Sequence, residues 1–444
     1  INAYRILILI IFTMIGVLQT LWIFLILALM VVRFKVGLSL YLAYIILVPY
    51  MSISFGGILL QWNFINMIVL LMAIYEFKIK RTNFKIDFKP LLPFLIYFCI
   101  SLIMMPFQNG VPIGIQFDTW RMQLMKYMIL SFALWNEMRL DASSVKLYRN
   151  VALICIAISA CYGLFLTTIV GANPYIMLLS ITNGSEFNEN YALAFGEGRI
   201  FGRISSVFTH PMMFGLFLGI SLIYVFFNRK VLNKYIFILL FLIITINMIV
   251  CGVRSVIAGT VIAIILFLLQ TRNFKMVLIA AIIGLVGYNI INSIPELSTY
   301  IGSIADIDNQ KQDVTGSSLS MRMEQLYGCF EEIDNSLLFG KGFGWTGYYT
   351  TLHGDHPIIL SFESLIYIIL CNSGLIGVLL WAFLIFKIMR RNSIFVKETK
   401  VLLNTLLFFY LAYSCITGEY GYMQLYIIFY VLMQGEALLN SNKL

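Results

Sequence analysis

Charged side chains are scarce in this sequence of 444 residues. Only 11% of the residues are Asp, Glu, Lys or Arg, whereas 61% are hydrophobic. Soluble domains carry about 25% charged and about 45–50% apolar residues. The composition therefore excludes a soluble globular enzyme and a disordered chain. Its long unbroken apolar runs differ from the weak alternation of a membrane β-barrel, so we predict an all-α polytopic membrane protein.

The sequence also lacks a disulfide framework and a metal-binding motif. Six of its seven cysteines lie in or beside apolar runs, and only Cys329 is in a long polar loop. The three histidines and their acidic neighbours fit no standard zinc-site spacing. We therefore expect no metal and no cofactor. A cleavable signal is not expected either, because the first apolar run is too long for the hydrophobic region of a signal peptide.

Apolar runs long enough to cross a bilayer recur along the chain. A transmembrane helix needs roughly 20 predominantly apolar residues. The sequence predicts 12–14 such helices within a single integral-membrane domain, 1–444. The thirteen runs that we assign are 6–32, 36–54, 58–76, 90–107, 120–136, 147–170, 206–227, 235–251, 254–271, 276–293, 360–387, 400–417 and 420–438. No internal repeat is visible, so nothing indicates the repeat symmetry of many transporters.

Basic residues distinguish the two sides of the predicted membrane domain. If the spans alternate, 21 of the 30 Lys and Arg residues fall on a single side, which the positive-inside rule makes cytoplasmic. Topology thus explains the net charge of +9, and no nucleic-acid partner is expected. The opposite side holds most of the acidic residues and two long loops, about 171–205 and 294–359.

The longer of these loops contains a helical pattern. Apolar residues follow one another there at spacings of four, three, four and three, which is typical of an amphipathic helix. They are Leu319, Met323, Leu326, Phe330 and Ile333. We predict this helix over about 315–335. The glycine-rich stretch 340–347 then predicts tight, irregular backbone.

The positive-inside rule does not explain the arginines on the extracytoplasmic side. Arg254 lies in the stretch CGVRS between two apolar runs, and an arginine at that depth is costly. It faces water, an anionic ligand, lipid headgroups or an acid such as Glu419. Arg199 and Arg203 lie in the stretch GRIFGR, where glycine lets a ligand approach the backbone. Arg322 lies on the predicted loop helix, where position alone favours a solvated charged face with local ion pairs.

Histidines and a carboxylate form a second group on this side. His210 enters a span directly before a proline, and a hydrogen-bonded helix-end histidine is the simpler interpretation of it. His353, Asp355 and His356 precede Glu363, which stands at the mouth of a span. A carboxylate at that position is costly unless it is paired or functional, so Glu363 is a candidate general base. Arginine forks suit phosphate, and the two groups together suit the headgroup of a lipid pyrophosphate.

These same residues resemble the O-antigen polymerase and ligase superfamily of membrane glycosyltransferases. Four segments between about 198 and 381 carry the resemblance, and they occur in the family's order. They are GR at 202–203 followed by VFTHP at 207–211, GVRS at 252–255, Arg322 followed by SLLFGKGFG at 336–344, and Glu363-Ser364 followed by GLIG at 374–377. The large loop lies where the family has its large periplasmic loop.

The resemblance implies a fold, a location and a set of partners. The fold would be GT-C-like and all-α, in the bacterial inner (cytoplasmic) membrane, with the active site and both long loops facing the periplasm. The partners would be undecaprenyl-diphosphate-linked oligosaccharides as donor and acceptor, the membrane lipid and a chain-length regulator protein. The implied reaction is a metal-independent, inverting glycosyl transfer that joins repeat units into O-antigen or a related surface polysaccharide.

The resemblance also implies roles for the candidate residues. Arg203, Arg254 and Arg322 would bind the diphosphate, and three other residues would support them, namely Arg199, His210 and His353. Ligases of the superfamily place a catalytic histidine at the head of the final motif, whereas Glu363 occupies that place here. This departure favours a polymerase over a ligase and leaves either Glu363 or His356 as the base.

Two other functions remain alternatives at this point. One is a ligase that transfers glycan to another acceptor. The other is a flippase or transporter of lipid-linked oligosaccharide, which should carry charge along a path through the bundle, whereas nearly every mid-span position here is apolar. Several aromatic residues are candidate sugar-stacking surfaces or members of an interfacial belt, and these are Trp120, Tyr191, Trp345, Tyr348 and Tyr349.

Overall fold

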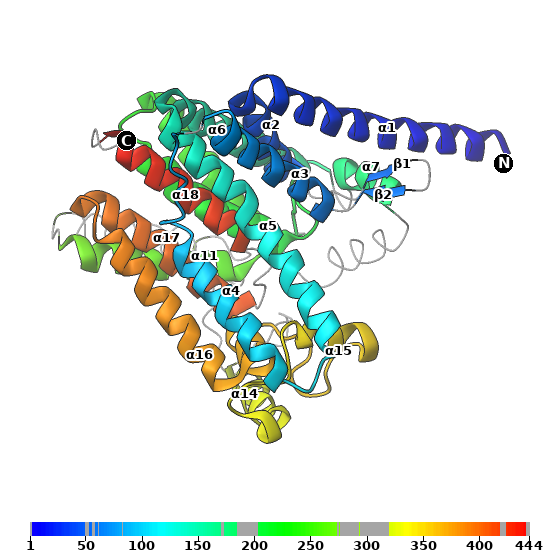
Figure 1. The fold of residues 1–444 in the computed structure, drawn as a ribbon, viewed down its shortest axis with the longest axis vertical. Coiled ribbons are helices and arrows are strands. Elements are labelled where there is room, and N and C mark those ends of the chain that lie inside the picture. Colours follow the sequence, from blue (N-terminus) through cyan, green and yellow to red (C-terminus); the bar gives the residue numbers. More distant parts are fainter. Residues whose placement is uncertain are drawn as a thin grey trace.

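The helices of the chain pack side by side into one bundle (Figure 1). The computed structural model describes residues 2–48, 53–55, 58–60, 62–81, 83–169, 173–183, 203–272, 275, 293, 319–417 and 423–440. The helices that fall on the predicted apolar runs are α1 (Asn2–Val32), α2 (Phe34–Leu47), α3 (Trp62–Ile74), α4 (Leu92–Met104), α5 (Ile113–Leu140), α6 (Ala142–Leu166), α9 (Pro211–Phe227), α10 (Lys234–Val250), α11 (Arg254–Thr271), α16 (Leu365–Asn392), α17 (Lys397–Thr417) and α18 (Met423–Asn440).

Twelve of the thirteen predicted runs therefore contain a helix, and the run 276–293 lies outside the described residues apart from Ser293. Four of the described helices, α6, α11, α16 and α17, are long and apolar enough to cross a membrane. Shorter apolar segments accompany them in α1, α2, α4, α9, α10 and α18. These lengths and compositions are compatible with an all-α membrane protein.

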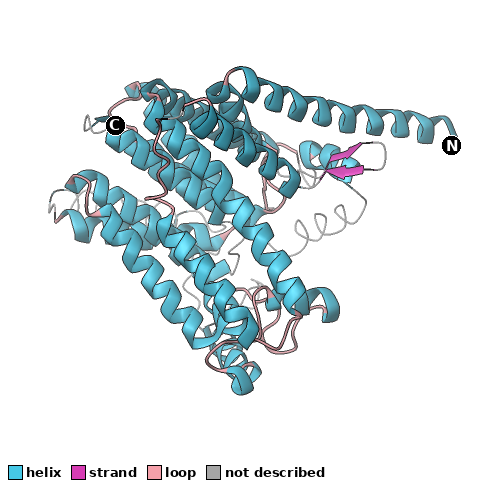
Figure 2. Ribbon diagram, in the orientation of Figure 1, coloured by secondary structure: helices cyan, strands magenta, loops and turns pink. Residues whose placement is uncertain are grey.

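A β-hairpin interrupts the helical pattern near the N-terminus. Strands β1 (Ile53–Phe55) and β2 (Ile58–Leu60) pair antiparallel and lie beside α1 and α7 (Figure 2). The apolar composition of 36–54 and 58–76 predicts continuous helices, whereas α2 ends at Leu47 and α3 begins at Trp62. The two residues between the strands are both glycine, a sequence typical of two-residue hairpin turns. This local signal outweighs the apolar composition.

Three further helices belong to the two long loops. Helix α7 (Pro174–Asn183) lies in the first loop, and α14 (Leu319–Glu332) and α15 (Trp345–His353) lie in the second. Helix α14 falls within the range predicted for an amphipathic helix. Both α14 and α15 contact α16, and Figure 1 shows them together at one end of α4, α5 and α16.

An ion pair and a hydrogen bond bring the basic segments of the first half of the chain together. Lys35 Nζ lies 2.8 Å from Asp141 Oδ2, and Arg139 donates to the backbone oxygen of Lys85 at 3.0 Å. Asp141 stands between α5 and α6, and its hydrogen bond with Lys35 lowers the pKa of the carboxyl group to about 2. The segments around residues 35, 85 and 140 therefore meet at one end of their helices.

The second half of the chain repeats this arrangement. Arg229 and Lys230 both pair with Glu398, and Lys397 Nζ lies 3.4 Å from the backbone oxygen of Thr271. These contacts join the ends of α9, α11 and α17 that carry basic residues. The opposite ends of the same helices carry the site described below.

Helix α18 forms the centre of the bundle. Every residue from Met423 to Met433 is buried, and the helix contacts α5, α6, α9 and α17. By contrast, α10 and α11 expose rows of large apolar side chains. A helix that is apolar on all sides is buried in protein or faces lipid, so both kinds of helix suit a bundle inside a membrane.

Helix α16 is broken at Gly374, and the preceding loop fills the break. Gly374 has φ +61° and ψ −157°, which is not a helical conformation. The N–H groups of Leu375 and Ile376 donate instead to the carbonyl oxygens of Leu337 and Leu338, at 3.0 and 3.1 Å. Because an unpaired backbone group costs several kcal/mol in hydrocarbon, such a break is tolerated only where protein satisfies it.

The loop also pairs with the helical residues that precede Gly374. The N–H groups of Lys341 and Gly342 donate to the carbonyl oxygens of Cys371 and Asn372, at 2.8 and 3.1 Å. The two backbones approach so closely that a Cβ atom added to Gly340 would lie 2.5 Å from the nitrogen of Ser373. Glycine is therefore required on the loop as well as on the helix.

Two buried glutamines hold this junction against the rest of the bundle. Gln108 donates through Nε2 to the carbonyl oxygens of Phe339 and Asn372, at 2.6 and 3.0 Å. Gln116 accepts the backbone N–H of Phe343 at 2.9 Å. Hydrogen bonds of buried groups are expensive to lose, so the connection between α4 and α5 and the loop 337–343 form one rigid unit with α16.

We expect Gly374→Ala to destabilise the protein. Its Cβ atom would lie 2.6 Å from the carbonyl oxygens of Leu337 and Leu338, in a residue with positive φ. The expected cost is about 1–3 kcal/mol, measured as a lower melting temperature of the detergent-purified protein. Gly347→Ala is the matched control, because Gly347 lies in a helix with no atom within 4 Å of an added Cβ. Equal melting temperatures for Gly374→Ala and wild type would contradict the assigned role of the break.

Candidate functional site

Three of the predicted arginines and the predicted carboxylate line one pocket. The pocket has a volume of about 170 Å³, and its charged lining residues are Arg203, Arg254, Arg322 and Glu363. These residues come from the segment before α9, the start of α11, helix α14 and the segment before α16. The pocket therefore unites positions spread over 160 residues of sequence and carries a net positive charge.

A tight turn places Arg254 at this pocket. Helix α10 ends at Val250, and α11 begins at Arg254 itself. Gly252 turns the chain with φ +69°, and Val253 is buried. A cation at the N-terminus of a helix opposes the helix dipole. An anion bound in the pocket would be attracted by both the guanidinium and the helix terminus.

Arg322 reaches the pocket because α14 docks on the ends of α16 and α17. Its Nη2 atom donates to the carbonyl oxygen of Ile416 at 3.0 Å, and the hydroxyl of Tyr367 donates to the backbone oxygen of Arg322 at 2.8 Å. Ile416 is in the last turn of α17, where carbonyl groups lack helical partners. Its position in the sequence favours a solvated charged face. In the structure Arg322 is half-buried, so its surroundings differ from that expectation. Its guanidinium has further N–H groups for a ligand.

Arg203 is held by a buried polar segment. Asn173 donates to the backbone oxygen of Ser206 at 2.7 Å, and the hydroxyl of Ser206 donates to the backbone oxygen of Ser159 at 2.6 Å. Ser206 has φ +50°, an uncommon conformation for a residue other than glycine. These bonds fix the chain between Arg203 and α9.

His210 lies directly before α9 and caps it. Its Nδ1 atom accepts the N–H of Met212 at 3.1 Å, and Met212 lines the pocket. Because Nδ1 accepts this hydrogen bond, it carries no proton. The imidazole is therefore neutral, and the positive charge of the site belongs to its arginines.

Glu363 stands in a turn with unusual backbone geometry. Leu360 and Phe362 both have positive φ, +56° and +57°, although neither is glycine. Ser361 Oγ lies 3.5 Å from Glu363 Oε1, and Ser364 caps the N-terminus of α16 through the N–H of Ile366. Backbone strain of this kind is concentrated at functional sites.

The two other histidines lie outside this pocket. His356 is buried, its Nδ1 accepts the N–H groups of Ile358 and Ile359 at 3.2 and 3.0 Å, and its Nε2 lies 3.5 Å from Glu332 Oε2. His353 is exposed at the end of α15. Arg199, and Glu419 as a partner for Arg254, fall outside the described residues. Within the described ranges, no group of three or more His, Cys, Asp and Glu side chains is arranged to hold a metal ion.

Part of the pocket wall could not be found from sequence. Gly252, Val253 and Ser255 are the sequence neighbours of Arg254 and line the pocket with it. A pocket at Arg254 is therefore expected to include them. Ile416 and Thr417 also line the pocket, but they are an unremarkable apolar helix end in the sequence. Only the docking of α14 on α17 reveals their position.

A scan of the sequence against protein-family models finds no match. A search of curated proteins finds no significant match either. The geometry of the pocket therefore carries the functional argument.

We expect the pocket to bind inorganic pyrophosphate. A ligand that binds only the folded state raises the melting temperature, so pyrophosphate with EDTA should stabilise the detergent-purified protein. Arg254→Gln should weaken binding by about tenfold or more, because hydrogen bonds to charged groups contribute about 1.5–3 kcal/mol. Arg121→Gln is the matched control, since Arg121 pairs with Asp118 and does not line the pocket. Equal shifts in both variants would show that pyrophosphate binds elsewhere.

Proposed function

We propose that this protein is a membrane glycosyltransferase that polymerises lipid-diphosphate-linked oligosaccharide units into a surface polysaccharide. The observation that carries the proposal is the pocket in which Arg203, Arg254, Arg322 and Glu363 meet. It lies at the ends of α9, α11, α16 and α17 that are opposite to the basic loops. Under the positive-inside rule this is the extracytoplasmic side, which in a bacterial inner membrane is the periplasm. A GT-C-like fold with 12–14 spans is part of the same proposal.

The arginines provide the binding site for the diphosphate of the donor. Guanidinium groups bind phosphate oxygens through paired N–H donors, and three of them line this small pocket. Because the pocket adjoins apolar helices, an undecaprenyl tail can remain in lipid while its diphosphate binds. Fixed positive charge stabilises the diphosphate as it leaves, so the reaction as proposed needs no metal.

Glu363 acts as the general base of the proposed reaction. The hydroxyl at the non-reducing end of an acceptor unit attacks the anomeric carbon of the donor sugar. The bond from that carbon to the diphosphate oxygen breaks with inversion, undecaprenyl diphosphate leaves, and the hydroxyl proton passes to Glu363. A base must lie within hydrogen-bond reach of the proton it removes. Glu363 lines the pocket, whereas His356 has its Nδ1 occupied by two backbone N–H groups, which supports Glu363 over His356.

The direct test is turnover by the purified protein. Lipid-diphosphate-linked repeat units from the organism that encodes the chain are incubated with the protein in detergent and EDTA, and the products are separated by size. We expect a ladder of lengthening glycan. Arg254→Ala should reduce the rate by about 10²–10³-fold, the usual effect of removing one charge-stabilising donor, while the protein stays folded and inserted. Glu363→Gln should also slow chain growth strongly, because glutamine cannot accept the hydroxyl proton.

Matched variants control for loss of charge alone. Arg121→Ala and Glu324→Gln alter exposed residues that do not line the pocket, and both should polymerise like wild type. Normal polymer from Arg254→Ala would show that its assigned role is wrong. If wild type makes no ladder but transfers glycan to an added acceptor, the protein is a ligase. Movement of the lipid-linked unit across a vesicle membrane without either product would identify a transporter.

A further inference from the structure

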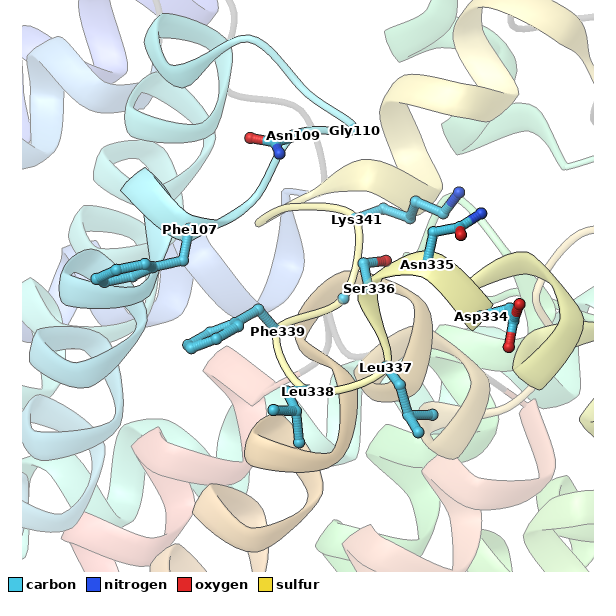
Figure 3. Close-up of a pocket in the computed structure, with 11 residues that line it drawn as sticks. Phe107, Asn109, Gly110, Asp334, Asn335, Ser336, Leu337, Leu338, Phe339 and Lys341 are labelled. Carbon is cyan, nitrogen blue, oxygen red and sulfur yellow. The ribbon is translucent and has the colours of Figure 1, made fainter.

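A second and larger cleft opens beside the break in α16. It has a volume of about 480 Å³. One wall comes from Phe107, Asn109 and Gly110, which follow α4, and the other comes from residues 334–341, which precede α15 (Figure 3). None of the residues of the arginine pocket line it. The cleft is therefore a separate site, and the function proposed above does not use it.

An aromatic platform forms the apolar part of the cleft. The rings of Phe107 and Phe339 stack with centroids 5.2 Å apart and an interplanar angle of 21°, and Figure 3 shows them side by side at one end of the cleft. Phe107 is 60% exposed. Stacked aromatic rings present a flat apolar face. The C–H face of a pyranose ring matches such a surface.

Polar side chains line the rest of the cleft. Asn109, Asn335 and Asp334 are all exposed. The two amides both donate and accept hydrogen bonds, and the single carboxylate accepts them. The cation of the cleft, Lys341, is already paired with Glu332 at 3.0 Å. This lining suits a neutral ligand rich in hydroxyl groups. It differs from the arginine pocket, which suits an anion.

The walls of the cleft are held in place before any ligand binds. The N–H of Gly110 donates to the carbonyl oxygen of Lys341 at 2.7 Å, and Gln108 bridges to Phe339. The same loop bonds to the break in α16 at Leu375. A site that is already ordered loses little entropy when it binds a flexible chain.

We propose that this cleft binds the sugar chain of the lipid-linked oligosaccharide at a distance from its diphosphate. The inference rests on the proposed function, because it assigns the cleft to another part of the same substrate. Helix α16 connects the two sites: Glu363 precedes its first turn, and the cleft loop bonds to it at Leu375. The helical segment 365–373 lies between them and spans about 12 Å of helix axis before the break at Gly374. An oligosaccharide spans such a distance, whereas a single sugar does not.

Binding of a free oligosaccharide tests this cleft apart from catalysis. The probe is a set of oligosaccharides released by mild acid from the surface polysaccharide of the encoding organism. They carry no diphosphate and no lipid, so the arginine pocket has no anion to bind. Their Kd is measured by ligand-observed NMR on the full-length protein in detergent. We expect Phe107→Ala and Asn335→Ala each to raise the Kd by about tenfold, and Arg254→Ala to leave it unchanged.

The control for Phe107→Ala is Phe386→Ala, because Phe386 is 58% exposed and lies on α16 away from both sites. It should bind like wild type. Because Phe107 and Asn335 are exposed, their truncation should leave the melting temperature unchanged. Unchanged Kd in Phe107→Ala and Asn335→Ala would overturn the proposal, as would weaker binding in Arg254→Ala alone.

The two proposals fail in different ways. If the oligosaccharide binds with the expected effects of the variants but no lipid-linked substrate is turned over, the cleft is supported and the polymerase function is wrong. If the ladder of products forms normally in Phe107→Ala and wild type binds no free oligosaccharide, the polymerase function is supported and the cleft assignment is wrong.

Discussion

Four backbone hydrogen bonds across the break in α16 determine the arrangement of this end of the molecule. Inside a bilayer, a helix cannot break unless other protein groups pair with its freed N–H and C=O groups. The loop 337–342 does so from both sides of Gly374. The requirement acts in both directions, because the helix needs the loop for its backbone pairing and the loop gains a fixed position from the helix.

Both candidate sites follow from this junction. On one side it holds the loop that carries α14, whose Arg322 reaches the end of α17. On the other side it presents Phe339 against Phe107. Gln108 and Gln116 extend the junction to α4 and α5. A larger residue at Gly340 or Gly374 would separate the loop from α16. It would therefore disturb the arginine pocket and the aromatic cleft together.

Electrostatics divides the molecule into two ends with different uses of positive charge. At one end, basic side chains pair with Asp141 and Glu398 at the surface, and exposed pairs of this kind contribute little to stability. At the other end, three arginines line a pocket with a single carboxylate. Several guanidinium groups around one small pocket attract an anion with several oxygens, which is why the pocket suits a diphosphate and the basic loops do not.

Composition and spacing alone determined most of the helical architecture and the choice of charged candidates. Apolar runs located twelve helices because a membrane helix must be apolar along its length, and Arg254 was conspicuous because arginine is rare at that depth. The tertiary structure decided which candidates meet. It brought Arg322 to the pocket through α14 and left His356 within its own loop, and it opened a cleft at Phe107 and Phe339, which no pattern had distinguished from other apolar residues. The physical reason is that periodicity reports the environment of each residue within its own segment, whereas contacts between distant segments depend on how those segments pack against one another in the folded chain.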